Sequence, residues 1–187
     1  MSCEKAALRK FYKEKTALLE NKEALSQKIA ARLFALDEFK NCSLLFAYYS
    51  LPSEVSTEPI IKRAKEDSKP VALPRCAKSG NEMCFYLLQN ENELEAVRFK
   101  GIFEPKTSLQ RAVCDEESLL LVPAVAYGKN GSRLGKGMGF YDRFIASFKG
   151  KTVGLCFESC LDNALPETAF DKRVQIVITE NETLFIK

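Results

Sequence analysis

Apolar residues recur at helical spacing through the first forty residues of the chain. Two amphipathic helices are therefore predicted, over residues 3–20 and 22–39, and Asn21 can cap the second. The apolar stripe expected to bury the first helix consists of Ala7, Phe11, Leu18 and Leu19. The stripe of the second helix consists of Leu25, Ile29, Leu33 and Leu36.

Short runs of consecutive apolar residues follow, and such runs are typical of strands buried on both faces. The strongest run is LLLVPAVAY at residues 119–127. The other predicted strands cover residues 43–50, 70–74, 82–88, 152–157 and 174–179, with an edge strand at 183–187. A further helix is predicted after Thr57, which is a candidate N-cap. Another helix is predicted to begin near Phe140, and a short helix is predicted at 91–96.

Strands that alternate with helices predict an α/β fold. The length favours a single domain over residues 1–187. We expect a three-layer α/β/α arrangement with a mainly parallel central sheet and the two helices at the N-terminus. In such folds ligands bind beyond the carboxyl ends of the strands, so the loop after residue 127 is the first place to search for a site.

The composition excludes several kinds of chemistry and location. The chain has no histidine, which excludes Ser-His-Asp and Cys-His nucleophiles, an imidazole general base and any histidine metal ligand. The seven cysteines form no CxxC pair, so reduced thiols, several of them in the core, are favoured over a zinc site. A net charge of +3 does not indicate nucleic-acid binding. Without a signal-like apolar segment or a membrane-length run, a cytoplasmic protein with no membrane partner is expected.

The loop at residues 128–143 reads GKNGSRLGKGMGFYDR and combines alternate glycines with cations. Its alternate glycines are Gly135, Gly137 and Gly139, and its cations include Arg133, Lys136 and Arg143. Glycines let backbone N–H groups approach an anion closely, and a helix that starts at the end of the loop adds its positive dipole end. The pattern therefore favours a cradle for a polyphosphate over the alternative, a surface loop whose glycines only turn the chain.

Two familiar phosphate motifs do not fit this loop. A Walker A sequence would need glycine at Asn130 and Ser or Thr at Gly137. The dinucleotide fingerprint needs GxGxxG directly after its strand, whereas this spacing is GxGxG and begins well beyond the strand. Asp142, just past the glycines, suits a Mg²⁺ ion beside phosphates, although an acid stabilised by the helix dipole is an equal alternative.

The segment RLGKGMGFYDR at residues 133–143 resembles the signature of the 5-formyltetrahydrofolate cyclo-ligase family, R-L-G-x-G-x-G-[FY]-Y-D, at every fixed position. The resemblance extends over almost the whole chain. The supporting segments, in the order expected for the family, are KAALR at 5–9, EVSTEPII at 54–61, LPR at 73–75, EP at 104–105 and FDKRVQIVITE at 170–180.

The resemblance implies an ATP- and Mg²⁺-dependent conversion of 5-formyltetrahydrofolate, with or without a polyglutamate tail, to 5,10-methenyltetrahydrofolate. The formyl oxygen would attack the γ-phosphate of ATP, and N10 would then close the ring with loss of phosphate. Phosphoryl transfer depends mainly on positioning and charge neutralisation. Because the substrate supplies both attacking atoms, a chain without histidine can perform this chemistry. A monomer is expected.

The resemblance also assigns roles to individual residues. Those implied for ATP are Lys5, Arg9, Arg133, Leu134, Gly135, Lys136, Gly137, Met138, Gly139, Phe140 and Tyr141. Those implied for the folate are Tyr49, Glu54, Lys136 and Phe140, and those implied for Mg²⁺ are Asp142 and Asp171. Without the family, Lys5 and Arg9 would be interpreted as solvated cations, Tyr49 as a core residue, and Glu54 and Asp171 as ordinary loop acids.

Two positions depart from the family pattern. Many members have His before the second acid, where this chain has Phe170 before Asp171, and many have Phe-Asp in place of Tyr127-Gly128. Two other hypotheses therefore stay open. One is a nucleotide- or folate-binding module that has lost catalysis. The other is a different ATP-dependent kinase or ligase on the same fold.

Overall fold

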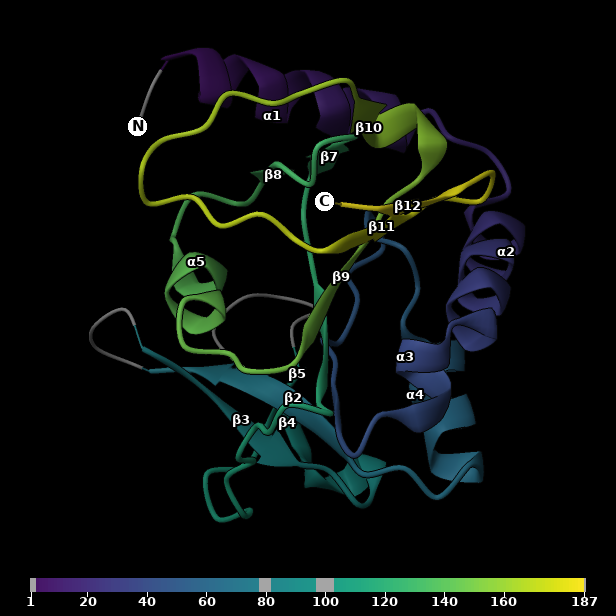
Figure 1. Ribbon diagram of the computed structural model, residues 1–187, viewed down its shortest axis with the longest axis vertical. Coiled ribbons are helices and arrows are strands. Elements are labelled where there is room, and N and C mark those ends of the chain that lie inside the picture. The colour runs from purple at the N-terminus through teal and green to yellow at the C-terminus, as the bar shows by residue number, and fades with distance from the viewer. Residues whose placement is uncertain (1–2, 78–81, 97–102, 187) are drawn as a thin grey trace.

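The computed structural model describes residues 3–77, 82–96 and 103–186. Its centre is a seven-stranded sheet in the order β12-β11-β9-β6-β1-β2-β3 (Figure 1). The strands of this sheet are β1 (Leu45–Phe46), β2 (Val71–Cys76), β3 (Met83–Leu87), β6 (Leu119–Val122), β9 (Lys151–Leu155), β11 (Ile176–Ile178) and β12 (Thr183–Phe185). The five inner strands are parallel and the two edge strands antiparallel, which confirms the predicted α/β fold with a mainly parallel sheet.

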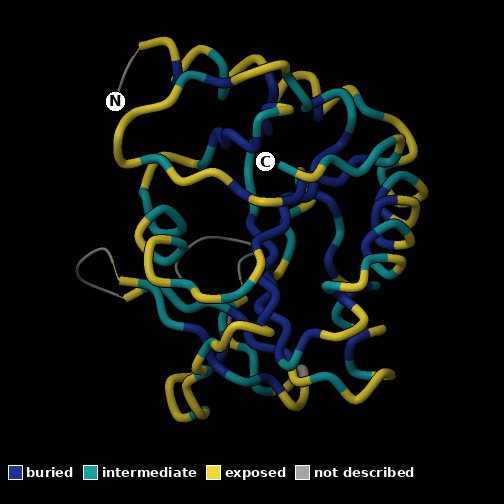
Figure 2. The backbone as a smooth tube through the Cα atoms, viewed as in Figure 1, coloured by how far each residue is buried: buried dark blue, intermediate teal, exposed yellow. Residues whose placement is uncertain are grey.

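Alternate residues of the inner strands point into two cores on opposite faces of the sheet. Leu119 and Leu121 of β6 belong to the core beneath one group of helices, whereas Leu120 and Val122 belong to the core on the other face. The helices on the first face are α2 (Lys22–Ala35), α3 (Asp37–Asn41) and α4 (Glu58–Glu66). The short helix α5 (Phe140–Ile145) packs on the second face, and Figure 2 shows the buried strands between the two layers.

The predicted strand at 119–127 is divided between two sheets. Proline cannot donate to a ladder, and at Pro123 the chain leaves the central sheet. It continues as β7 (Ala126–Gly128), which pairs with β8 (Arg133–Leu134) and β10 (Leu161–Asp162) in a small sheet of its own. This bend places the start of the glycine loop above the central sheet.

The first helix, α1 (Cys3–Ala17), does not bury the predicted apolar stripe. Phe11 is 52% exposed and Leu18 lies beyond the helix at 83% exposed. The buried residues of α1 are Lys5, Tyr12 and Thr16. The stripe prediction was wrong because α1 packs against polar loops and the turn η2 (Glu158–Cys160) rather than against the sheet. Figure 1 shows α1 crossing above the small sheet.

The predicted helix at 22–39 is interrupted at Leu36. Its backbone is extended there, with φ −69° and ψ 139°, and α3 begins at the next residue. The interruption lets Phe39 reach the core at 1% exposure and contact Phe34, with ring centroids 5.2 Å apart. Asn21 precedes α2 in the left-handed conformation, with φ 54° and no side-chain capping bond, so its expected capping role is wrong.

Two smaller expectations also change. Thr57 precedes α4, but its hydroxyl donates to the carbonyl oxygen of Tyr48 over 2.5 Å instead of capping the helix. The helix expected at 91–96 is one turn, η1 (Glu91–Glu93), and then β4 (Leu94–Ala96), which pairs with β5 (Phe103–Pro105).

Three of the cysteines, Cys42, Cys156 and Cys160, are buried, and all seven are free thiols. Among the described residues, no cluster of three or more acidic, Cys or His side chains could hold a metal. None of the described helices has the length and hydropathy needed to cross a bilayer.

Gly154 in β9 lies against the ring of Tyr127 in β7, so a substitution at Gly154 probes the packing between the two sheets. A Cβ added there would lie 2.4 Å from Cζ of Tyr127, whose hydroxyl donates to the carbonyl oxygen of Val122 over 2.6 Å. The buried ring cannot move aside without losing that bond. We expect Gly154→Ala to lower the free energy of unfolding by about 1–3 kcal/mol, the usual cost of overpacking, as measured by urea denaturation.

The control removes the ring. In a Tyr127→Leu background the clash is relieved, so Gly154→Ala should lower the free energy of unfolding by less than about 1 kcal/mol. The same loss in both backgrounds would contradict this account of the packing.

Candidate active site

Four segments that are distant in the sequence meet beyond the carboxyl ends of the parallel strands. They are the N-terminal half of α1, the loop after β1, the glycine loop with the start of α5, and the segment at 168–172. Each is joined to another by a contact between a charged side chain and its partner. The joining contacts are Lys5–Asp171, Arg9–Gly135 and Glu54–Lys136, and a fourth pair, Arg133–Asp142, links the two ends of the glycine loop itself.

The glycines of the loop serve different purposes. Gly137 and Gly139 have φ of 100° and 66°, in the region that favours glycine, as predicted. Gly135 does not have a positive φ. It lies close to a side chain instead: a Cβ there would lie 2.8 Å from Nη1 of Arg133, so the guanidinium would have to shift. The loop therefore turns sharply while it stays against the Arg133 side chain.

The two cations of α1 face the loop from one side of the helix. Lys5 Nζ donates to Oδ2 of Asp171 over 2.5 Å, and Arg9 Nε donates to the carbonyl oxygen of Gly135 over 2.7 Å. Nη1 of Arg9 is buried and has no hydrogen-bond partner among the described residues. The predicted i,i+4 arrangement of Lys5 and Arg9 thus places both on the glycine loop and its neighbouring segment.

Arg133 and Asp142 form a buried ion pair at the two ends of the glycine loop. Nη2 of Arg133 lies 2.6 Å from Oδ1 of Asp142, and the Lys172 backbone N–H donates to the same oxygen over 3.1 Å. Arg133 is only 8% exposed, and its Nε has no hydrogen-bond partner within the described part of the chain. Its guanidinium also lies over the ring of Tyr141, 5.9 Å from the centroid.

Asp171 is held by three donors on one oxygen. Besides Lys5, the backbone N–H and the hydroxyl of Thr168 donate to Oδ2 over 2.5 and 2.8 Å. Burial alone would raise the pKa of Asp171, but the hydrogen bonds from Lys5 and Thr168 outweigh it, and its pKa lies below the ordinary value. Asp171 is therefore a carboxylate near neutral pH.

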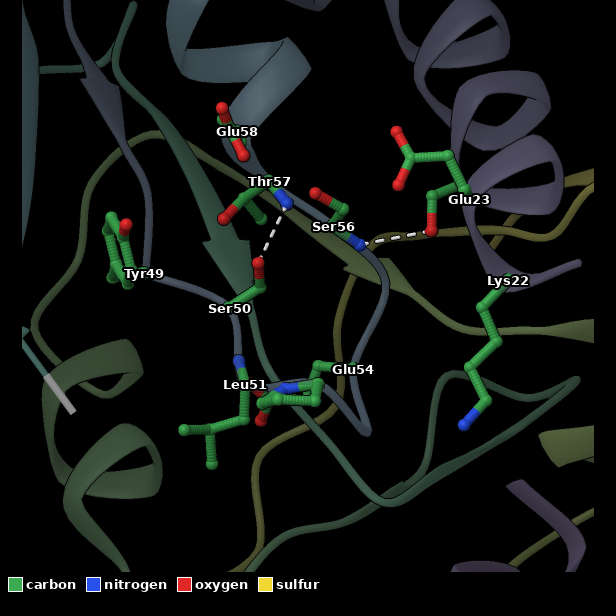
Figure 3. A pocket seen from close by; sticks show the side chains of 11 residues that line it. Lys22, Glu23, Tyr49, Ser50, Leu51, Glu54, Ser56, Thr57 and Glu58 are labelled. Carbon is green, nitrogen blue, oxygen red and sulfur yellow. Dashed lines mark hydrogen bonds between the residues drawn. The ribbon is translucent and has the colours of Figure 1, made fainter. Parts of the chain in front are cut away.

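A pocket of about 290 Å³ opens beside the loop that follows β1. Its lining includes Tyr49, Glu54, Ser56 and Lys22, and Figure 3 shows Lys22 across the pocket from Tyr49. The bend of the loop is held by hydrogen bonds from Leu51 N–H to Oε2 of Glu54 and from Ser56 N–H to the hydroxyl of Ser26.

Glu54 connects this pocket to the glycine loop. Its side chain is only 6% exposed, and Oε1 lies 2.7 Å from Nζ of Lys136. This contact is an ion pair without hydrogen-bond alignment, because Oε1 has no hydrogen-bond partner among the described residues. One carboxylate thus faces both the pocket and the cation of the loop.

Tyr141 is buried at its hydroxyl, which also lacks a hydrogen-bond partner in the described structure. Burial raises the pKa of this hydroxyl well above its ordinary value, and the nearby charge of Glu54 adds to the increase. Tyr141 therefore remains a protonated donor at neutral pH. An unused donor in a buried place costs free energy unless a ligand accepts its hydrogen bond.

The remaining residues of the predicted site differ in how exposed their side chains are and in what they contact. Leu134 is 1% exposed and packs in the core of the second face, so only its backbone faces the loop. Met138 is 61% exposed, and its carbonyl oxygen accepts from Nη2 of Arg143 over 2.9 Å. Phe140 lies under the Arg143 guanidinium, 5.6 Å from the centroid. Phe170, the position where the family resemblance leads us to expect histidine, is 85% exposed.

Two residues near the pocket were not anticipated. Lys22 begins α2 and lines the pocket, but its sequence context is that of an ordinary solvated lysine. Phe103 is 41% exposed and its ring packs edge-on against Tyr49, with centroids 5.6 Å apart. The supporting segment EP at 104–105, directly after Phe103, was the nearest signal in the sequence.

Comparison with known proteins places this arrangement in a family. The family model described as the 5-formyltetrahydrofolate cyclo-ligase family matches residues 1–180. A 5-formyltetrahydrofolate cyclo-ligase of Haemophilus influenzae is 29% identical over 169 residues, which cover 88% of this chain and 89% of the relative. The protein of the same name from Escherichia coli K12 is 27% identical over 168 residues, with 87% and 92% covered.

Solved structures agree with the sequence comparison. A 5,10-methenyltetrahydrofolate synthetase of Aquifex aeolicus superposes with a TM-score of 0.84 at 32% identity and covers 98% of this chain and 93% of its own. A second synthetase, from Mycoplasma pneumoniae, has a TM-score of 0.72 over 94% and 98% of the two chains, and at 20% identity it supports the fold alone. With its signature loop, its fold and a match over nearly its whole length, this chain belongs to the 5-formyltetrahydrofolate cyclo-ligase family.

Proposed function

We propose that this enzyme converts 5-formyltetrahydrofolate to 5,10-methenyltetrahydrofolate and hydrolyses ATP to ADP and phosphate in the process. The observation that best supports the proposal is the set of buried donors without partners around the glycine loop. They are Nη1 of Arg9, Nε of Arg133 and the hydroxyl of Tyr141. Burying such donors is unfavourable unless a ligand pairs with them, and a polyphosphate offers many acceptor oxygens.

The donor set also fits Mg²⁺, which prefers one or two carboxylates together with phosphate oxygens and water. Asp142 and Asp171 would hold the ion. Each uses one oxygen for its hydrogen bonds, and no partner is described for Oδ2 of Asp142 or Oδ1 of Asp171. When bound, Mg²⁺ supplies neutralisation of the phosphate charge.

The pocket beside Tyr49 and Glu54 suits the folate. An aromatic face can stack on the pterin, and a buried carboxylate can accept from its N–H groups. Lys22, on the opposite wall, would offer a cation to the carboxylates of the glutamyl part. The Glu54–Lys136 ion pair lies between this pocket and the phosphate loop, so it would be next to both substrates.

The reaction needs no nucleophile from the protein. The formyl oxygen forms a bond to the γ-phosphorus while the bond from that phosphorus to the bridging oxygen breaks, and ADP leaves. N10 then attacks the activated carbon and loses its proton, and phosphate departs. In this proposal Lys5, Arg9 and Arg133 orient the phosphates and stabilise the charge that spreads over them during transfer.

The activity itself is tested by absorbance. Purified enzyme with 5-formyltetrahydrofolate, ATP and MgCl₂ should generate the absorbance of methenyltetrahydrofolate, and omission of ATP or addition of excess EDTA should abolish it. A cyclo-ligase of known activity serves as the positive control. If only that control forms product, while calorimetry still detects binding of ATP and folate, the chain is a binding module that has lost catalysis.

Asp142 tests the proposed metal site. We expect Asp142→Asn to lower kcat by about 100-fold or more, because the amide keeps the shape but loses the charge that holds the metal. The melting temperature should fall, because the Arg133 guanidinium loses its matching charge, so turnover is compared at a temperature where circular dichroism shows both proteins folded. Asp37→Asn, a change at an acid whose side chain is 84% exposed, is the matched control and should retain full turnover. Unchanged turnover of Asp142→Asn at low Mg²⁺ would exclude the metal role.

Glu54 tests the proposed folate pocket. Glu54→Gln removes the charge that faces the pocket, and we expect KM for 5-formyltetrahydrofolate to rise about tenfold, the usual effect of losing a hydrogen bond to a charged group. KM for ATP should change less than that for the folate. Steady-state kinetics with each substrate varied in turn measures both. A selective rise in KM for ATP would place Glu54 on the nucleotide side instead.

A further inference from the structure

Helix α1 is attached to the molecule through polar contacts in its second half. The hydroxyl of Tyr12 donates to Oδ2 of Asp162 over 2.5 Å, and Tyr12 is only 3% exposed. One turn later, the hydroxyl of Thr16 donates to the Tyr12 carbonyl oxygen over 2.8 Å and lies 3.1 Å from Sγ of Cys160. These residues reach η2 and β10, whereas the neighbouring Phe11 is exposed.

The anchor and the two cations lie along one face of the same helix. Lys5, Arg9, Tyr12 and Thr16 follow one another at spacings of four, three and four residues, which places them in a row. The first half of that row contacts the proposed phosphate site, and the second half contacts Asp162 and Cys160. A helix is stiff over this length, so holding one end determines where the other end lies.

Asp162 belongs to the same small sheet that supports the glycine loop. It pairs with Gly128 in the neighbouring strand β7, and its carbonyl oxygen accepts from the Lys129 N–H over 2.8 Å. Strand β7 pairs in turn with β8, where Tyr127 lies opposite Arg133. The bond from Tyr12 therefore fixes α1 to the sheet from which the phosphate loop begins.

Besides these bonds, α1 is held by the contacts of Lys5 and Arg9 with Asp171 and Gly135. Its apolar contribution is small: Phe11 is exposed, and among the described residues of the helix Tyr12 and the half-buried Leu8 belong to or pack against a hydrophobic core. The bond from Tyr12 to Asp162 is partly buried, and a hydrogen bond to a carboxylate is stronger than one between neutral groups. Its loss would let α1 shift without exposing a large apolar surface.

We propose that Tyr12 and Asp162 are positioning residues that hold α1 so that Lys5 and Arg9 face the glycine loop, and that they thereby set the affinity for the nucleoside triphosphate. This inference rests on the proposed role of Lys5 and Arg9 at the phosphates. It assigns a function to two residues that lie outside the signature and act only through the helix.

The test measures MgATP binding by calorimetry, so that it does not depend on turnover. Tyr12→Phe removes only the hydroxyl, and we expect it to weaken MgATP binding about tenfold, with 5-formyltetrahydrofolate binding changed less than twofold. Tyr86→Phe, the same change at a buried tyrosine of β3, is the matched control and should leave both affinities unchanged. Equal binding by Tyr12→Phe and the unmodified protein would overturn the proposal.

Conservative replacement at Asp162 provides a second variant. Asp162→Asn keeps an oxygen that can accept from Tyr12 and should lose less than threefold in affinity, whereas Asp162→Ala should lose about tenfold. If both variants retain full affinity, the anchor has no role in nucleotide binding. If both lose affinity for ATP and folate equally, the bond serves only the stability of the fold, and the proposal is wrong.

A double background separates this inference from the proposed function. In Lys5→Met/Arg9→Met protein, MgATP binding should be weak, and adding Tyr12→Phe should change it by less than twofold because the groups it positions are gone. A further tenfold loss would show that Tyr12 acts by another route. If Lys5→Met/Arg9→Met itself leaves MgATP binding intact, the proposed role of those cations fails instead.

Discussion

Three acids at the proposed site, Asp142, Asp171 and Glu54, have largely buried side chains, and a charge there must be matched by an opposite charge. That requirement links the segments of the site. Asp171 is matched by Lys5 from α1, Asp142 by Arg133, and Glu54 by Lys136. Each pair joins two parts of the chain that are distant in sequence or lie at opposite ends of the loop. The geometry of the glycine loop is therefore a consequence of charge matching as much as of its glycines.

The same pairs suggest how ligands would act on the site. Lys5 and Arg133 are bound to carboxylates, so phosphates and a metal would compete for groups that are already paired. The unpaired buried donors of Arg9, Arg133 and Tyr141 would gain hydrogen bonds from an anion, which favours its binding. Exchange of partners would let the phosphates pair with Lys5 and Arg133 while the metal pairs with the carboxylates that these cations release. Because Lys136 contacts Glu54, binding of a ligand at the glycine loop would change the affinity of the pocket beside Tyr49.

The local features of the protein could be predicted from its sequence, and the long-range ones could not. Apolar runs identified the strands, and the spacing of Lys5 and Arg9 correctly placed both cations on one helical face. The ion-pair partners depend on contacts between distant segments, which no spacing reveals. The predicted strand through Pro123 was too long because the run remains apolar where the chain passes to a second sheet. The buried face of α1 was predicted wrongly from the apolar stripe containing Phe11. The helix packs through Tyr12 and Lys5, whose polar contacts a hydrophobicity pattern does not detect.

The polar attachment of α1 has a consequence for how the protein opens. The response of an unfolding step to denaturant scales with the surface that the step exposes. Release of α1 would uncover little apolar surface, whereas release of a central strand would uncover both cores. Fluctuations that detach α1 should therefore be frequent local events that urea hardly promotes. The cations proposed to bind the phosphates would then lie on an element that opens without the rest of the fold.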